Sequence, residues 1–187
     1  IWSIVMAATM YGDVNDKIMA KAKQIKLFVC DIDGVFSDGR IYLGNDGEEL
    51  KAFHTKDGFG VKALVKSGVE VAVITGRKSN IVQTRMTALN VNHIVQGQED
   101  KLPALKEIAE KLSLTLSEIA YIGDDVADLP CIKAVGLGIA VNDAHPLVLK
   151  SANYQTFIKG GFGAVRECTD LIMQSQNTLS QASGASV

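Results

Sequence analysis

Four groups of polar side chains follow the short apolar segments of this chain, each where a strand would end or the next helix would begin. In chain order they are Asp31 with Asp33, Thr75 with Gly76 and Arg77, Lys101, and Asp124 with Asp125 and Asp128. An isolated acid pair most often starts a turn or caps a helix. The carboxyl ends of parallel strands, however, meet at one edge of a sheet, so the four groups are expected to share a pocket.

The chemistry that this set of side chains can perform is metal-assisted phosphoryl transfer. Carboxylates are hard oxygen ligands that suit Mg²⁺, which also bridges to phosphate. A phosphomonoester is strongly negative, and a metal ion together with Lys101 would offset its repulsion by the carboxylates. Thr75 could donate a hydrogen bond to a phosphoryl oxygen. Asp31 could attack phosphorus to form an aspartyl phosphate, while Asp33 could protonate the leaving alkoxide and then activate water.

Alternating strands and helices must position these groups. Apolar runs predict buried strands at 26–30, 71–75, 94–95, 120–123 and 136–141. Apolar residues at helical spacing lie between them, most clearly along 102–112. The alternation predicts an α/β fold with βαβ units, a parallel sheet and right-handed crossovers.

One segment breaks the alternation. Residues 40–53 surround a turn rich in Asn, Asp and Gly, which predicts a β-hairpin between the first strand and the first following helix. Such a flap would project over the carboxyl end of the sheet. It is too short to form a stable layer alone, so packing against copies of itself is expected to bury its apolar residues, Ile41, Leu43, Leu50 and Phe53.

Length and composition narrow the class of protein. The 187 residues predict a single domain over 1–187, with a loose tail at about 176–187. The formal net charge of −2 argues against a general nucleic-acid binder. No run approaches a membrane helix, and residues 1–10 lack the basic start of a signal peptide, which favours the cytoplasm. Cys30, Cys131 and Cys168 are widely spaced and are expected to be buried thiols in a reducing compartment.

The four ordered motifs, from Asp31 to Asp128, resemble the haloacid dehalogenase superfamily of phosphohydrolases. The resemblance implies a Rossmann-like core and Mg²⁺-dependent phosphoryl transfer through an aspartyl phosphate. It makes Asp31 the nucleophile and Asp33 the acid/base. It further implies metal ligation by Asp31, the Asp33 backbone carbonyl and Asp124, phosphate binding by Thr75 and Lys101, supporting roles for Gly76 and Asp125, and a structural role for Asp128.

Longer segments of the sequence resemble one particular family within this superfamily. Residues 31–39, 47–53, 56–60, 74–78, 144–146 and 160–167 are similar to the 3-deoxy-D-manno-octulosonate 8-phosphate phosphatases, and the similarity spans about residues 11–175. This family implies a core without a separate cap domain, a tetramer in which a neighbour's hairpin helps to cover each active site, and a role in making the acidic sugar of lipopolysaccharide. The tail that follows Arg166 and Glu167 is a further candidate to reach a neighbouring pocket.

A phosphorylated sugar acid needs cations at two places, one for its phosphate and one for its carboxylate. If Arg77 begins the next helix, Arg77 and Arg85 share a helix face. Lys56 stands where the family usually has Arg, and Phe162 where an Arg can occur, so the sugar specificity stays open. The candidate substrate contacts are Asp33, His54, Thr55, Lys56, Asp57, Gly58, Lys62, Arg77, Arg85 and Lys101.

Two other classes of protein share some of these features. A phospho-accepting receiver domain uses similar groups, but its acceptor lies in mid-chain and its Lys comes last, which does not match the order here. A non-catalytic stabilising domain would not need both Asp31 and Asp33. Within the enzyme hypothesis, a nine-carbon sugar acid 9-phosphate is the alternative substrate. His93 is expected to be structural, and His145 to lie at a helix start before Pro146.

Overall fold

A six-stranded parallel sheet forms the centre of the molecule. The computed structural model describes residues 5–182, with the strands in the order β10-β9-β8-β3-β6-β7. The sheet strands are β3 (Leu27–Cys30), β6 (Glu70–Thr75), β7 (His93–Gln96), β8 (Ile119–Gly123), β9 (Leu137–Ala140) and β10 (Tyr154–Gln155). Residues of β3 and β8 are fully buried, as expected for strands covered on both faces.

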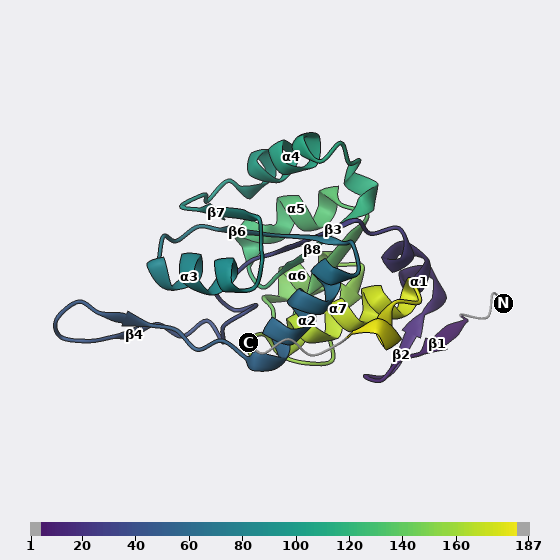
Figure 1. Ribbon diagram of the computed structural model, residues 1–187, viewed down its shortest axis with the longest axis horizontal. Helices are drawn as coiled ribbons and strands as arrows, with labels where there is room; N and C mark the ends of the chain where they lie inside the picture. The colour runs from purple at the N-terminus through teal and green to yellow at the C-terminus, as the bar shows by residue number, and fades with distance from the viewer. Residues whose placement is uncertain (1–4, 183–187) are drawn as a thin grey trace.

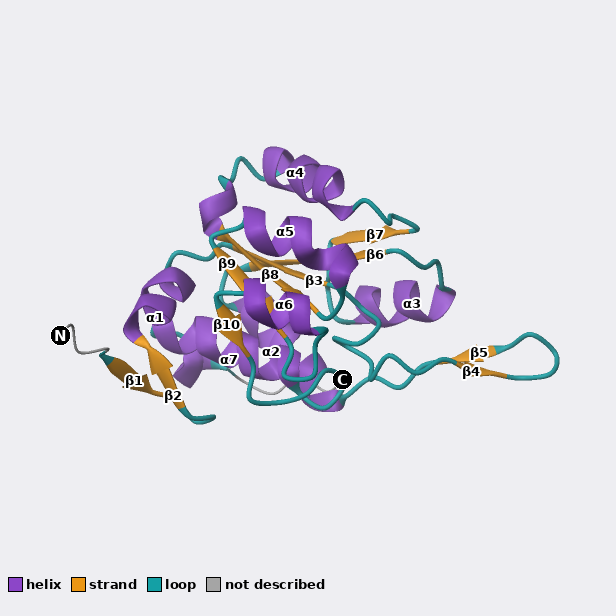
Figure 2. Ribbon diagram, turned by 180° about the vertical axis from the view of Figure 1, so that it is seen from behind, coloured by secondary structure: helices purple, strands orange, loops and turns teal. Residues whose placement is uncertain are grey.

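Helices cover both faces of this sheet. They are α1 (Asp16–Lys23), α2 (Thr55–Lys66), α3 (Asn80–Ala88), α4 (Lys101–Lys111), α5 (Leu129–Ala134), α6 (Pro146–Ser151) and α7 (Ala164–Ser175). Figures 1 and 2 show α4 and α5 on one side of the sheet and α1, α2 and α7 on the other. The predicted α/β class, the parallel sheet and the five predicted strands are therefore confirmed, and the described part of the chain shows no separate cap domain.

The predicted hairpin is present but its ladder is short. Strand β4 (Tyr42–Leu43) pairs antiparallel with β5 (Glu49–Leu50), and the pair projects away from the body of the molecule (Figure 2). Gly47 in its turn has φ +84°, a backbone conformation that favours glycine. Within one chain, Tyr42, Leu43 and Leu50 remain 49%, 73% and 63% exposed.

Three features of the fold were not predicted. A second small hairpin joins β1 (Met6–Ala8) to β2 (Asp13–Asn15), and β10 extends the edge of the sheet. The expectation of a loose tail does not hold for 176–182, because the Gln176 side chain donates to the Ile25 carbonyl at 2.7 Å and Leu179 packs on the core. Residues 183–187 of that expected tail lie outside the described residues.

Two predictions about single residues agree with the structure. All three cysteines are buried and unpaired. His145 is the N-cap of α6, where its Nδ1 accepts a hydrogen bond from the Leu147 amide at 3.2 Å and Pro146 occupies the first helical turn. Among the described residues, no helix has the length and apolar character to cross a bilayer.

Candidate active site

The four motif groups meet at the carboxyl edge of the sheet. Asp31 follows β3, the central strand, and its neighbours β6 and β8 end at Thr75 and just before Asp124. Lys101 is the first residue of α4. Together they border a cavity of about 490 Å³, lined by Asp31, Asp33, Gly39, Thr75, Gly76, Arg77, Glu99, Lys101, Asp124, Asp125 and Ala127.

Lys101 is the cation at the bottom of this cavity. Its Nζ lies 2.9 Å from Asp31 Oδ1 and 2.8 Å from Asp128 Oδ1, and its side chain is only 4% exposed. Burial lowers the pKa of the Lys101 ammonium, but the charges of Asp31 and Asp128 outweigh it and raise that pKa above its ordinary value. The ammonium is therefore held charged beside the candidate nucleophile.

Asp128 anchors the loop that follows β8. Its Oδ1 also accepts a hydrogen bond from the Tyr121 hydroxyl at 2.6 Å, and its Oδ2 accepts from the backbone amides of Asp124 and Asp125 at 3.0 and 3.3 Å. Both carboxylate oxygens are thus satisfied by protein donors, which is what a buried carboxylate requires. This anchoring fixes the direction in which Asp124 leaves the strand.

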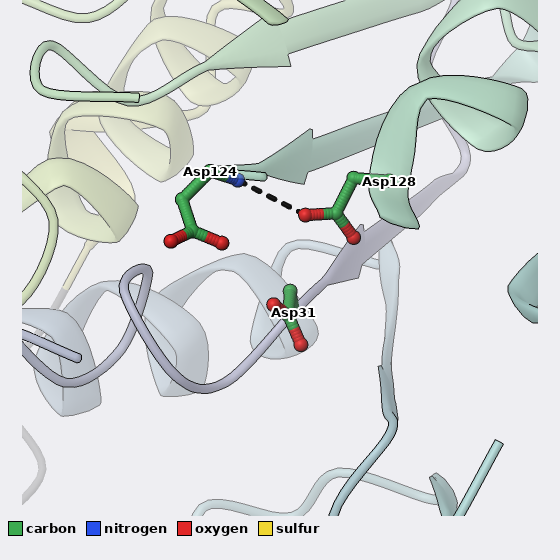
Figure 3. Close-up of side chains that lie close together, drawn as sticks. All are labelled: Asp31, Asp124 and Asp128. Atoms are coloured by element: carbon green, nitrogen blue, oxygen red, sulfur yellow. Dashed lines mark hydrogen bonds between the residues drawn. The ribbon is translucent and has the colours of Figure 1, made fainter. Parts of the chain in front are cut away.

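Three carboxyl groups converge at the mouth of β3 and β8. Figure 3 shows Asp31, Asp124 and Asp128 facing one space, and carboxylate oxygens of the three lie within 4.8 Å of one another. Burial and then the charge of Asp128 raise the pKa of Asp31 to about 6. Burial and then the charge of Asp31 raise the pKa of Asp124 to about 8.

These closely spaced carboxyl groups form a suitable binding site for a divalent cation. Since the oxygens of Asp128 are already taken by protein donors, Asp31 and Asp124 are the carboxylates that could ligate a metal, and a metal charge would relieve their repulsion. Gly34, with φ +84°, lies directly against the Asp124 carboxylate, where no side chain could be accommodated. The donor set therefore suits the Mg²⁺ implied by the motifs.

Asp33 lies on the other wall of the cavity and is held by Lys51 and Arg77, of which only Arg77 was singled out from the sequence. The Lys51 ammonium contacts Asp33 Oδ1, and the Lys51 side chain is 0% exposed. Arg77 Nε lies 3.8 Å from Asp33 Oδ2, while Arg77 Nη2 donates to Glu49 Oε2 at 2.9 Å. Glu49 and Lys51 come from the hairpin, and two signals could have pointed to them: the charge-rich returning strand at 48–51 and the family resemblance of residues 47–53.

A second set of predicted contacts lies outside this cavity. His54 is the N-cap of α2, where its Nδ1 accepts from the Lys56 amide at 3.1 Å. Thr55 and Lys56 are exposed, Gly58 is buried, and Lys62 is half-buried along the same helix. None of these five side chains is among those that line the cavity.

Asp57 and Arg85 are also separated from the cavity. Asp57 is 1% exposed, and its Oδ1 accepts from the Arg166 amide of α7 at 2.8 Å. Burial raises the pKa of Asp57 to about 7. Helix α3 begins at Asn80, so Arg77 precedes it and the condition for a helix face shared with Arg85 is not met. Arg85 borders a separate apolar hollow of about 570 Å³ with Phe53 and Ile81.

Comparison with known proteins gives one consistent result. Residues 79–159 match the family model described as haloacid dehalogenase-like hydrolase. The chain is 49% identical over 180 residues to the 3-deoxy-D-manno-octulosonate 8-phosphate phosphatase KdsC of Escherichia coli (strain K12), which covers 96% of both proteins. It is 50% identical over 179 residues to the protein of the same name from Yersinia pestis.

Solved structures agree with these relatives. The crystal structure of 3-deoxy-D-manno-octulosonate 8-phosphate phosphatase from Yersinia pestis has a TM-score of 0.97 at 48% identity, covering 99% of this chain and 100% of that one. The enzyme of the same name from Moraxella catarrhalis, solved in complex with a magnesium ion, a phosphate ion and a KDO molecule, has a TM-score of 0.87 at 45% identity, covering 89% of this chain and 95% of that one.

Proposed function

The chain belongs to the 3-deoxy-D-manno-octulosonate 8-phosphate phosphatases, a family of haloacid dehalogenase-like hydrolases, and from this premise we propose that it hydrolyses that sugar phosphate to the free sugar acid and inorganic phosphate. The observation that carries the proposal is the meeting of Asp31, Lys101 and Asp124 in one cavity at the sheet edge. The names of the relatives support the substrate. A cytoplasmic role in making the acidic sugar of lipopolysaccharide is part of the proposal, as the family resemblance implies.

The first chemical step begins at Asp31. Its carboxylate attacks phosphorus, so a bond forms between phosphorus and the Asp31 oxygen as the bond to the sugar oxygen breaks. Asp33, which must take up a proton on Oδ2 before this step, gives that proton to the leaving alkoxide, and Lys101 stabilises the charge on the transferring group. Thr75, 2% exposed at the end of β6, donates a hydrogen bond to a phosphoryl oxygen.

The second step regenerates the enzyme. Asp33, now ionised, takes a proton from a water molecule whose oxygen attacks the aspartyl phosphate, which releases phosphate and restores the Asp31 carboxylate. Asp31, the Asp33 carbonyl and Asp124 would hold Mg²⁺, which would supply positive charge to offset that of the phosphate. The amide of Gly76 and the Asp125 loop support these groups from the cavity wall.

The sugar acid also needs a cation for its carboxylate. Arg77 borders the cavity and is half exposed, so it is the proposed contact within one chain. His54, Thr55, Lys56, Asp57, Gly58, Lys62 and Arg85 lie outside that cavity. Substrate contact by any of them therefore requires a site that a neighbouring chain completes.

The hairpin supports such an assembly. Its ladder has only two residue pairs, and Tyr42, Leu43 and Leu50 offer apolar surface that no residue within 5–182 of the same chain covers. We propose a homotetramer of single-domain chains, each spanning 1–187, with the hairpins at its centre. Sedimentation of the double variant Leu43→Ser, Leu50→Ser should show monomers where the unmodified chain sediments as a tetramer, and a tetrameric variant contradicts this arrangement.

A panel of phosphorylated substrates tests the proposed activity. Phosphate release is measured from the eight-carbon sugar acid 8-phosphate, a nine-carbon sugar acid 9-phosphate and a neutral hexose 6-phosphate, each with Mg²⁺ and with excess chelator. We expect the eight-carbon substrate to react fastest and every rate to depend on Mg²⁺. A faster nine-carbon substrate would shift the specificity to the alternative substrate, and rates unchanged by chelation would refute the metal's role.

A further inference from the structure

Lys51 lies beside the catalytic groups, and its side chain is shielded from solvent more completely than any other charged side chain that borders them. It belongs, however, to the short hairpin that projects from the body of the molecule. Its side chain is 0% exposed, while the hairpin that carries it has strands of two residues each. Its Nζ contacts Asp33 Oδ1 and lies 3.4 Å from Glu49 Oε1. An ammonium removed from water is unfavourable unless it is paired, so these two carboxylates are what keep it there.

The ion pairs form a closed ring of alternating charge. Lys51 links Asp33 to Glu49, Glu49 Oε2 accepts from Arg77 Nη2 at 2.9 Å, and Arg77 Nε returns to Asp33 Oδ2 at 3.8 Å. Networks of this kind restrict each member to one geometry more strongly than isolated pairs do. The ring joins the hairpin directly to the catalytic loops after β3 and β6.

The two oxygens of Asp33 differ in this ring. Oδ1 is in direct contact with the Lys51 ammonium, whereas Oδ2 has Arg77 at 3.8 Å, which is too long for a hydrogen bond. Oδ2 is therefore the oxygen left to exchange a proton with the leaving group or with water. A carboxyl group that turned freely would present either oxygen, at variable distance, to the reacting atoms.

From this geometry we infer that Lys51, backed by Glu49, is a positioning residue for Asp33: it fixes Oδ1 so that Oδ2 performs the proton transfers. The inference rests on the proposed phosphatase activity. It makes the hairpin part of the catalytic machinery in its own chain, in addition to any role at an interface.

The test compares leaving groups. An alkyl phosphate expels an alkoxide that needs a proton, whereas an aryl phosphate with a nitrophenolate leaving group does not. In single-turnover measurements of the first step, Lys51→Met should slow the sugar acid phosphate by about 10- to 100-fold, the loss typical of a misplaced proton donor. The same variant should slow the aryl phosphate by less than about threefold in that step, since no proton transfer assists it.

Matched variants distinguish a positioning role of Lys51 from a general loss of structure caused by the substitution. Lys51→Arg keeps a cation at the site and should restore most of the rate with the alkyl substrate. Glu49→Gln should also slow the alkyl substrate more than the aryl substrate, but by a smaller factor than Lys51→Met does. Glu48→Gln, a change at the exposed neighbouring residue, should show no such difference between the substrates. Lys106→Met, on the exposed face of α4, controls for loss of a lysine elsewhere.

Each outcome decides the inference. Equal losses with both leaving groups, no rescue by Lys51→Arg, or rates for Lys51→Met equal to those for Lys106→Met would overturn it. A crystal structure of Lys51→Met gives a readout apart from activity, and an Asp33 carboxylate in its original position would also overturn the inference. If the unmodified chain releases no phosphate from any substrate, the proposed function has failed instead.

Discussion

Two buried lysines hold the two aspartates of the motif at 31–33, and they do so with different support. Lys101 bridges Asp31 and Asp128, and Lys51 bridges Asp33 and Glu49. Lys101 begins α4, which packs on β6, and Asp128 lies in the turn after β8, where it accepts a hydrogen bond from Tyr121 of that strand. Lys51 and Glu49 come from a hairpin that projects from the body of the molecule (Figure 1).

This difference in structural support distinguishes the candidate nucleophile, Asp31, from the candidate acid/base, Asp33. The candidate nucleophile is fixed by the core, so its geometry is as stable as the sheet itself. The candidate acid/base is fixed by a segment without a core of its own, so its geometry depends on how the hairpin is held. Attack on phosphorus and proton transfer should therefore respond differently to mutations in the two regions.

The largest expected effect comes from removing the nucleophile on the core side. Asp31→Asn should reduce phosphate release by at least about a thousandfold, because an amide is a poor nucleophile. Its free energy of unfolding should not fall, since the change also removes repulsion from Asp124 and Asp128. Phosphate-release assays and urea unfolding check both points, and more than a tenth of the original activity would exclude Asp31 as the nucleophile.

The next effect concerns stability. Asp128→Ala leaves the Tyr121 hydroxyl and two backbone amides without their acceptor and should lower the free energy of unfolding by about 3–5 kcal/mol. Glu49→Ala, the matching change on the hairpin side, should cost clearly less because that carboxylate is closer to solvent. Urea titration of both variants measures how much unfolding free energy each one loses. Equal losses would contradict the claim that the core supports its carboxylate more firmly than the hairpin does.

A smaller, pH-dependent effect is expected at Asp57, a buried carboxylate outside both clusters. Its Oδ2 has no hydrogen-bond partner in the described part of the chain, and burial raises its pKa to about 7, above the value of about 3.9 in an unfolded chain. The folded state therefore binds this proton more tightly, so the stability that Asp57 contributes is present below about pH 4 and is lost as the pH rises through about 7.

Asp57→Asn should remove that pH dependence. Its amide oxygen can still accept from the Arg166 amide. The variant should gain at most about 3 kcal/mol over the unmodified chain at pH 8 and little at pH 4, by unfolding measured across this range. Asp46→Asn at the exposed hairpin turn is the control, and identical pH profiles for all three proteins would contradict the shift at Asp57.

The positions of the site residues on the core side could be predicted from the sequence, whereas those on the hairpin side could not. Asp31, Thr75, Lys101 and Asp124 could be placed together because each follows or begins an element of a parallel sheet, whose strand ends must converge. Lys51 and Glu49 could not, because the direction of side chains on a two-residue strand depends on how the flap folds back. Asp57 and Arg85 were expected at the substrate on family resemblance, but Asp57 in the first turn of α2 and Arg85 in the last turn of α3 do not line the cavity.

Trapping of the phosphorylated enzyme tests the central claim most directly. The chain is mixed with Mg²⁺ and the sugar acid phosphate labelled with phosphorus-32, quenched in acid within milliseconds, digested and mapped. We expect label on Asp31 in the unmodified chain, none in Asp31→Asn, and longer-lived label in Asp33→Asn, where water is activated poorly. Label on another residue, such as His54, or full product formation with no label on Asp31 at any time would contradict it.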